Sequence, residues 1–116
     1  MPVWNTTAVA EQPDLTMDAW RVLEVPGGAQ HLVGFCLERC EGRVSTALVR
    51  LDPEQRVAVS ASGRSYRLVG KPGFNKDADY VWQRWAAVNG IKSWTDVSTP
   101  LWELLRARYQ SSSAKH

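Results

Sequence analysis

The sequence has few of the residues that build disulfide scaffolds, metal centres or membrane spans. Its 116 residues include two cysteines and two histidines. A tetrahedral zinc site would need all four of these residues, and one of them, His116, is the last in the chain. No stretch approaches the ~20 consecutive apolar residues that cross a bilayer. The sequence therefore predicts no metal, no cofactor and no membrane partner.

The chain also lacks the features of a secreted protein. Its first eight residues, MPVWNTTA, contain no lysine, no arginine and no continuous apolar stretch, so they do not form a secretory signal. Cys36 and Cys40 are four residues apart, and along one extended strand they would lie roughly 13 Å apart. If Cys40 bends into the following turn, a disulfide becomes conceivable but is not favoured. A disulfide requires Cα atoms within about 7 Å. We therefore expect two reduced thiols and a cytoplasmic location.

Charge is unevenly distributed along the chain. Residues 1–60 contain 5 basic and 8 acidic side chains, a net charge of −3, whereas residues 61–116 contain 9 basic and 4 acidic ones, a net charge of +5. This skew favours an anionic partner for the second half, yet it falls short of the basic stripe of a dedicated nucleic-acid binder.

The hydrophobic share of 44% and the charged share of 22% predict one soluble globular domain.

Alternating apolar and polar residues, interrupted by short turn sequences, predict five strands. Their expected ranges are Trp20–Val25, His31–Arg39, Arg43–Leu51, Arg56–Ala61 and Arg64–Val69. The connections have two to five residues, too few for a parallel crossover of about a dozen or more. We therefore expect an antiparallel meander of about five strands over residues 18–70. Residues 1–15 are expected to form an irregular lead-in.

After residue 73 the period of the apolar residues changes to that of a helix. Ala78, Trp82 and Trp85 recur at helical spacing and predict a helix over residues 76–89. Thr99 followed by Pro100 predicts the start of a second helix over residues 100–110. Strands followed by helices indicate a single α+β domain at residues 16–110, with a disordered tail at 111–116. The helices should pack on one face of the meander, or one should close the end of a partly closed barrel.

The most unusual local sequence is the segment 62–73, which combines three cations with three glycines. Glycine lets a backbone approach a ligand closely, so the segment is a candidate site for a phosphate. Its spacing matches neither the nucleotide phosphate loop nor the dinucleotide motif, and the alternative is a tight hairpin with solvent-facing arginines. The candidate ligand-binding residues are Arg64, Tyr66, Arg67 and Lys71.

Tryptophan is the other conspicuous residue, with four of the six between positions 82 and 102. Trp82 and Trp85 lie on the apolar stripe and are expected in the core. Trp94 lies in an expected loop and is the favoured contact with a protein partner, since tryptophan is enriched at interfaces. The basic side chains of the second helix, Arg106 and Arg108, are further candidate contacts.

No pair of side chains indicates catalysis. His31 and Cys36 have an odd separation, which puts a base and a nucleophile on opposite faces of one strand. Asp77 and Asp79 are two residues apart at a helix start and do not face each other. We therefore assign no catalytic residue.

Three runs, GRVSTA at 42–47, SGRSYRLVGKPG at 62–73 and DADYVWQRW at 77–85, resemble short proteins of no known activity. Plasmids and integrative elements of proteobacteria encode these proteins, and the resemblance covers about residues 30–90. It implies a bacterial cytoplasmic accessory protein and brings no activity, cofactor or catalytic residue.

Three functions stay open at this point. We prefer a non-enzymatic module that binds a protein partner. The first alternative is a binder of nucleic acid or of a phosphate ligand, which would use segment 62–73 and the basic C-terminal helix. The second alternative is a small enzyme with a pocket between the sheet and the helices.

Overall fold

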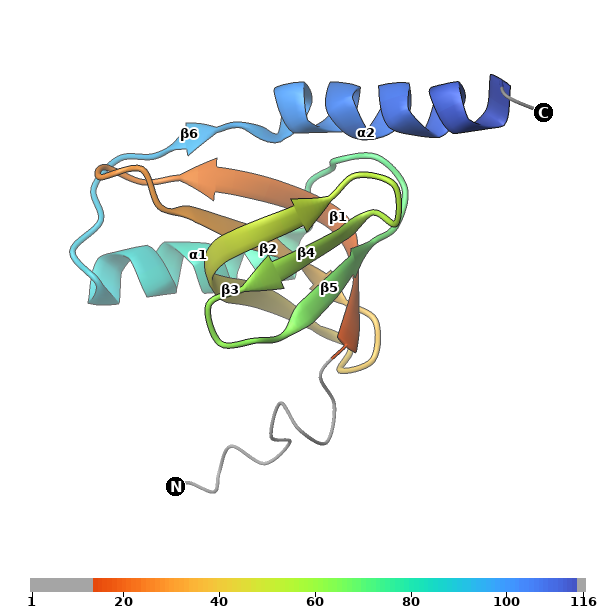
Figure 1. Cartoon of the computed structure of the whole chain (residues 1–116). Coiled ribbons are helices and arrows are strands. Elements are labelled where there is room, and N and C mark those ends of the chain that lie inside the picture. The colour runs from red at the N-terminus through yellow and green to blue at the C-terminus, as the bar shows by residue number, and fades with distance from the viewer. Residues whose placement is uncertain (1–13, 115–116) are drawn as a thin grey trace.

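The computed structural model describes residues 14–114, with side chains as far as residue 106, and has an α+β fold (Figure 1). Five strands form a barrel, and two helices pack on it. The strands of the barrel are β1 (Asp14–Glu24), β2 (Gln30–Cys36), β3 (Glu41–Asp52), β4 (Val57–Ser60) and β5 (Ser65–Leu68). They are followed by α1 (Lys76–Val88), the two-residue strand β6 (Thr95–Asp96) and α2 (Ser98–Ala114).

The barrel is closed by a parallel pairing between its first and last strands. Strands β1 to β5 pair antiparallel in chain order, as the short connections predict. β1 then pairs with β5 in parallel, with Leu15 opposite Tyr66. Hairpins reverse the chain at each step, so the first and the fifth strand point the same way and must pair in parallel. The predicted antiparallel meander is therefore a mixed, mostly antiparallel barrel. β6 adds a short antiparallel pairing to the far end of β1, where Asp96 lies opposite Leu23.

β1 begins at Asp14, before the predicted Trp20. A bulge interrupts its alternation of inward and outward residues, so the sequence pattern did not reveal the first part of the strand. Leu15, Met17, Trp20 and Val22 are all buried in the barrel. Their spacing is two, three and two residues, because Ala19 adopts a φ of 46° where the pairing with β2 shifts register. The extra residue restores the inward face of the strand. The expected irregular lead-in at residues 1–15 is thus wrong for residues 14 and 15, which belong to β1, and residues 1–13 lie outside the described part.

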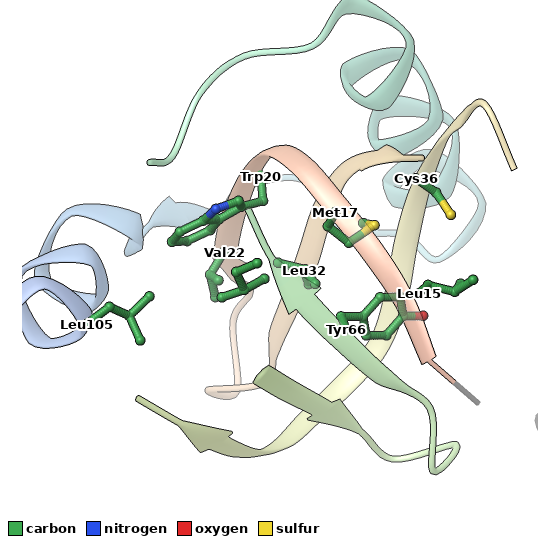
Figure 2. Close-up of a cluster of buried hydrophobic side chains, with 9 residues drawn as sticks. Leu15, Met17, Trp20, Val22, Leu32, Cys36, Tyr66 and Leu105 are labelled. Carbon is green, nitrogen blue, oxygen red and sulfur yellow. The ribbon is translucent and has the colours of Figure 1, made fainter. Parts of the chain in front are cut away.

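The first hydrophobic core fills the barrel (Figure 2). Its buried members are Leu15, Met17, Trp20, Val22, Leu32, Cys36, Tyr66, Leu68 and Leu105. Leu105 comes from α2 and lies at the opposite end of this core from Leu15 and Tyr66. α2 therefore covers one end of the barrel, which is the second of the two arrangements expected from the sequence. The Ser98 hydroxyl accepts a hydrogen bond of 2.9 Å from the Val22 N–H and fixes the start of α2 to β1.

The second core lies between α1, the outer faces of β2 and β3, and the end of β1. Its buried members are Leu23, Val25, Val33, Ala78, Trp82 and Ala86. Trp82 is fully buried, as expected, and the half-buried Trp85 stacks on it with ring centroids 5.1 Å apart. Since β1 and β2 are covered on both faces, neighbouring residues such as Leu32 and Val33 are buried together.

Local hydrogen bonds determine where the two helices begin. The side chain of Asn75 caps α1 by accepting a hydrogen bond of 2.9 Å from the Ala78 N–H. α2 begins at Ser98, because the Asp96 carboxylate accepts the Ser98 N–H at 2.8 Å. It continues to Ala114, so the expected disordered tail is wrong for residues 111–114, which are helical. Residues 115–116 lie outside the described part.

Candidate binding face

One outer face of the barrel is formed by β4, β5 and the adjoining ends of β3 and β1. The main contacts of the helices lie elsewhere: α1 packs against β2 and β3, and α2 packs against β1 (Figure 1). We call this surface the open face. It is made of the outward-pointing residues Asp14, Arg50, Asp52, Gln55, Val57, Val59, Ser65 and Arg67.

The register of the strands arranges these side chains in two rows across the sheet. The rows are Asp52–Val57–Arg67 and Arg50–Val59–Ser65–Asp14. Val57 and Val59 are half-buried and form the apolar centre of the face. Their neighbour Ala58 points into the barrel and is fully buried, in keeping with the two-residue alternation of a strand. The open face therefore has an apolar floor on β4 and polar side chains on the strands to either side.

Charges of both signs surround this floor. Arg50 and Asp52 lie two residues apart on β3, and Arg67 and Asp14 lie on β5 and β1. Among the residues that the structure describes, neither Arg50 nor Arg67 takes part in an ion pair. Asp52 also accepts hydrogen bonds from the backbone N–H groups of the turn that follows, the nearest at 3.1 Å. This turn fixes the position of Gln55 at the edge of the face.

The charged side chains and one valine line a pocket of ≈430 Å³. Its walls are Asp14, Arg50, Asp52, Gln55, Val57, Ser65 and Arg67. The volume lies within the range of about 300–1,000 Å³ that is usual for ligand sites. The walls are mostly polar, however, and four of the seven side chains are charged at neutral pH. The pocket is therefore suited to polar or charged groups of a partner.

The four candidates from the segment 62–73 do not come together at one site. Tyr66 and Arg67 are neighbours on β5, so one points into the barrel and the other outward to the open face. Lys71 is exposed on the loop after β5. Arg64, which the hairpin alternative expects in solvent, is only 5% exposed. Burial lowers the pKa of the Arg64 guanidinium, and the positive charge of Arg43 lowers it further.

The candidate contacts for a protein partner are also scattered. Trp94 is half-buried, and its ring meets that of Trp82 edge to face with centroids 5.3 Å apart. Arg106 is exposed on α2 and pairs with Glu103 at 3.4 Å. Arg108 lies in α2, and its side chain is outside the described part. The role of Trp94 as a contact with a protein partner therefore stays a prediction. Its side chain has less exposed surface than we expect for a residue in an open loop.

His31 and Cys36 lie on opposite faces of β2, as predicted. His31 packs outside the barrel against Trp85, with ring centroids 4.5 Å apart, and its Nδ1 lies 2.9 Å from the Ser45 carbonyl oxygen. Cys36 is a free thiol inside the barrel, and burial raises its pKa. Within the described part of the chain, no three histidine, cysteine or acidic side chains gather to hold a metal ion. No described helix is both long and apolar enough to cross a membrane.

Sequence reasoning missed most of the open face. Arg50 and Asp52 are alternate residues of a predicted strand, and this spacing could have placed them on one face. The sequence could not place Asp14 on the same face, because its position depends on the parallel pairing of β1 with β5 that closes the barrel.

Comparisons with known proteins provide no template for this face. The chain matches no protein-family model, no curated protein and no solved structure.

Proposed function

We propose that this protein is a non-enzymatic binding module that holds a protein partner on its open face. The observation that carries the proposal is the half-buried pair Val57 and Val59 at the centre of a ring of charged and polar groups. Protein interfaces have this composition, with an apolar centre that loses its water and a polar rim that stays partly hydrated. We expect the partner to place an apolar side chain over the two valines.

The mixed charge favours a protein over a nucleic acid. A phosphate backbone would be attracted by Arg50 and Arg67 but repelled by Asp14 and Asp52. A protein surface can present acidic groups to the arginines and basic groups to the aspartates. Such complementarity fixes orientation and suppresses wrong partners. We therefore prefer a protein partner to the nucleic-acid or phosphate alternative at this face.

The walls of the pocket on this face contain neither a histidine nor a cysteine. Binding is therefore the function that this arrangement favours.

The expected location of the protein is part of the same proposal. Cys36 and Cys40 are both free, and unpaired thiols are the rule in the reducing cytoplasm. We infer a cytoplasmic accessory protein of a bacterium, in line with the resemblance of its sequence.

Site-specific photo-crosslinking in the cells that naturally make the protein tests this proposal. A photoreactive amino acid replaces Gln55, an exposed wall of the pocket, or Tyr80, an exposed residue of α1 that serves as the control. We expect position 55 to crosslink to one discrete polypeptide and position 80 to give no such product. The same products from both positions, or nucleic acid at position 55, would contradict the proposal.

A charge reversal in the same experiment tests the role of the arginines. Arg67→Glu should remove most of the crosslinked product at position 55, since it places an anion where the partner's acidic group is expected. Arg84→Glu on the exposed surface of α1 is the matched control and should leave the product unchanged. Equal loss in both variants would show that net charge, and not the open face, governs the contact.

A further inference from the structure

The second half of β3 has a neighbouring strand on one side only. β2 pairs with β3 as far as His31 opposite Ala47, whereas β3 continues to Asp52. On its other side, this part of β3 pairs with β4, where Leu51 lies opposite Ala58. No described strand borders residues 48–52 on the side of β2. We call this open side of residues 48–52 the β3 edge.

The backbone groups of Leu51 point outward along the β3 edge. Alternate residues of an antiparallel strand direct both backbone groups to the same neighbouring strand. In β4, the Ser60 N–H donates to the Arg64 carbonyl oxygen at 3.0 Å, on the side of β5. The preceding residue, Val59, therefore faces β3, where it lies opposite Arg50. Arg50 thus directs its backbone groups to β4, and Leu51, the next residue, presents its N–H and carbonyl oxygen to the open side.

An apolar groove runs between the β3 edge and α2. It consists of two adjoining cavities of ≈240 Å³ and ≈280 Å³, which share Gln30 and Leu101 as walls. The first cavity is also lined by residues 48–51 of β3, and the second by Leu104 of α2. The side chain of Val49 is 65% exposed in this groove. Exposed apolar side chains that gather in a groove are typical of an interaction site.

Arg50 connects the groove with the open face. Its side chain lines the first cavity of the groove and also the pocket that contains Asp52 and Arg67. Among the described residues, Arg50 takes part in no ion pair. An acidic side chain on a strand beside the β3 edge would be attracted to this guanidinium, because opposite charges on adjacent strands stabilise their pairing. The groove and the open face can therefore hold the same partner.

We propose that the protein partner adds one extended, acidic and apolar segment to the β3 edge, as a further strand between β3 and α2. An extended backbone fits this place because it can accept from and donate to Leu51 at once. Its side chains alternate between the two faces of the sheet. One set contacts the leucines of the groove, and the other set includes the acidic group beside Arg50. The inference rests on the proposed function, since it specifies how the partner on the open face is recognised.

Selection of random linear heptapeptides, displayed on phage, against the immobilised full chain tests this inference. We expect the enriched sequences to alternate apolar residues with residues that include an acid. The affinity of one enriched synthetic peptide is then measured by fluorescence anisotropy. N-methylation of the amides that face β3 should weaken binding about tenfold or more, because each methyl group removes a backbone hydrogen bond. N-methylation of the intervening amides should leave the affinity nearly unchanged.

Two substitutions in the full chain locate the bound peptide. Val49→Lys places a charge in the apolar groove and should lower the affinity about tenfold or more. Val88→Lys on α1 is the matched control, because Val88 is also exposed, and it should bind like the wild type. An equal loss in both variants, or equal sensitivity to methylation at every amide, would overturn the added strand.

Crosslinking at position 55 separates failure of this inference from failure of the proposed function. A discrete product at position 55 without any enriched peptide keeps the protein partner on the open face and overturns the extended segment. An enriched peptide that depends on Val49, with no product at position 55, supports the β3 edge as a peptide site and contradicts the proposed function.

Discussion

Leu15 of β1 lies opposite Tyr66 of β5 in parallel register, and this pair closes the barrel. Both side chains are buried in the core (Figure 2). The same register places Asp14 opposite Ser65 on the outside, where both line the pocket of the open face. One strand pairing therefore builds the end of the core and completes the candidate binding surface. Substitutions that disrupt the pairing of β1 with β5 should lower both the stability of the fold and the affinity for the partner.

The attachment of α2 can be tested with two adjacent leucines. Leu105 is 1% exposed in the barrel core, whereas Leu104 is 46% exposed. Leu105→Ala should lower the free energy of unfolding by about 2–5 kcal/mol, because it leaves a cavity beneath the helix. Leu104→Ala should change it by less than about 0.5 kcal/mol. Urea unfolding measures both values, and equal effects would mean that α2 does not cover the barrel end.

The contact between α1 and β3 depends on the absence of a side chain at Gly42. A Cβ atom there would lie 2.5 Å from the Ala78 nitrogen and from the Asp77 carbonyl, which are backbone atoms of α1. Gly42→Ala should therefore destabilise the fold by about 1–3 kcal/mol, since α1 must shift. At Gly73 the nearest atom would be at an ordinary 3.5 Å, so Gly73→Ala is the control. A Gly42→Ala protein as stable as this control would contradict the described packing.

The stability of the fold should fall in acid partly through Glu38. Burial alone would raise its pKa, but hydrogen bonds from the Thr16 hydroxyl and N–H hold the pKa below the ordinary value of 4.5. A carboxyl group with a lowered pKa in the folded state stabilises the protein above the unfolded pKa. This contribution is lost as the pH falls through the folded pKa.

Unfolding by urea at neutral pH and at a pH below 4.5 measures this loss. Glu38→Gln should be less stable than the wild type at neutral pH and should approach it in acid. Thr16→Val, which keeps the backbone N–H, should give a smaller change of the same sign. An equal loss of stability on acidification in the wild type and in Glu38→Gln would exclude Glu38 as a source of the acid dependence.

The two thiols should differ in reactivity. Cys40 is exposed, whereas Cys36 is buried and burial, assisted by the nearby Glu38, raises its pKa. Since the thiolate is the reactive form, iodoacetamide should modify only Cys40 in the native protein. Mass spectrometry of native Cys40→Ser should find no modification, and the unfolded variant should be modified fully. Rapid labelling of native Cys40→Ser would place Cys36 outside the barrel core.

The order of strands and helices could be predicted from the sequence because local periodicity determines it. The alternation in β4 and β5 and the helical stripe through Trp82 both reflect burial on one face. The start of β1 could not be predicted, because the bulge at Ala19 interrupts the alternation between Met17 and Trp20. A partly closed barrel was one of two arrangements left open, and its parallel closure could not be predicted, since it uses the part of β1 before the bulge.

The candidate site was harder to predict than the fold, because it depends on neighbours far apart in the chain. Both Arg64 and Arg67 belong to segment 62–73, so local composition grouped them. The Arg64 side chain is buried, whereas the Arg67 side chain points outward to the open face. Arg50 and Asp52, which line the pocket with Arg67, come from β3 through strand pairings that the composition of segment 62–73 does not contain. Trp94 lies in a connection outside the helices, as expected, but its contact with Trp82 takes up part of its surface.

Mapping of backbone amide resonances tests the central claim most directly. The isotope-labelled full chain is titrated with the purified polypeptide recovered by crosslinking at position 55. We predict that the largest amide shifts fall at residues 50–59 and 65–67, and that Arg67→Glu abolishes them. Shifts centred on Trp94 and α1, with the open face unchanged, would contradict the account.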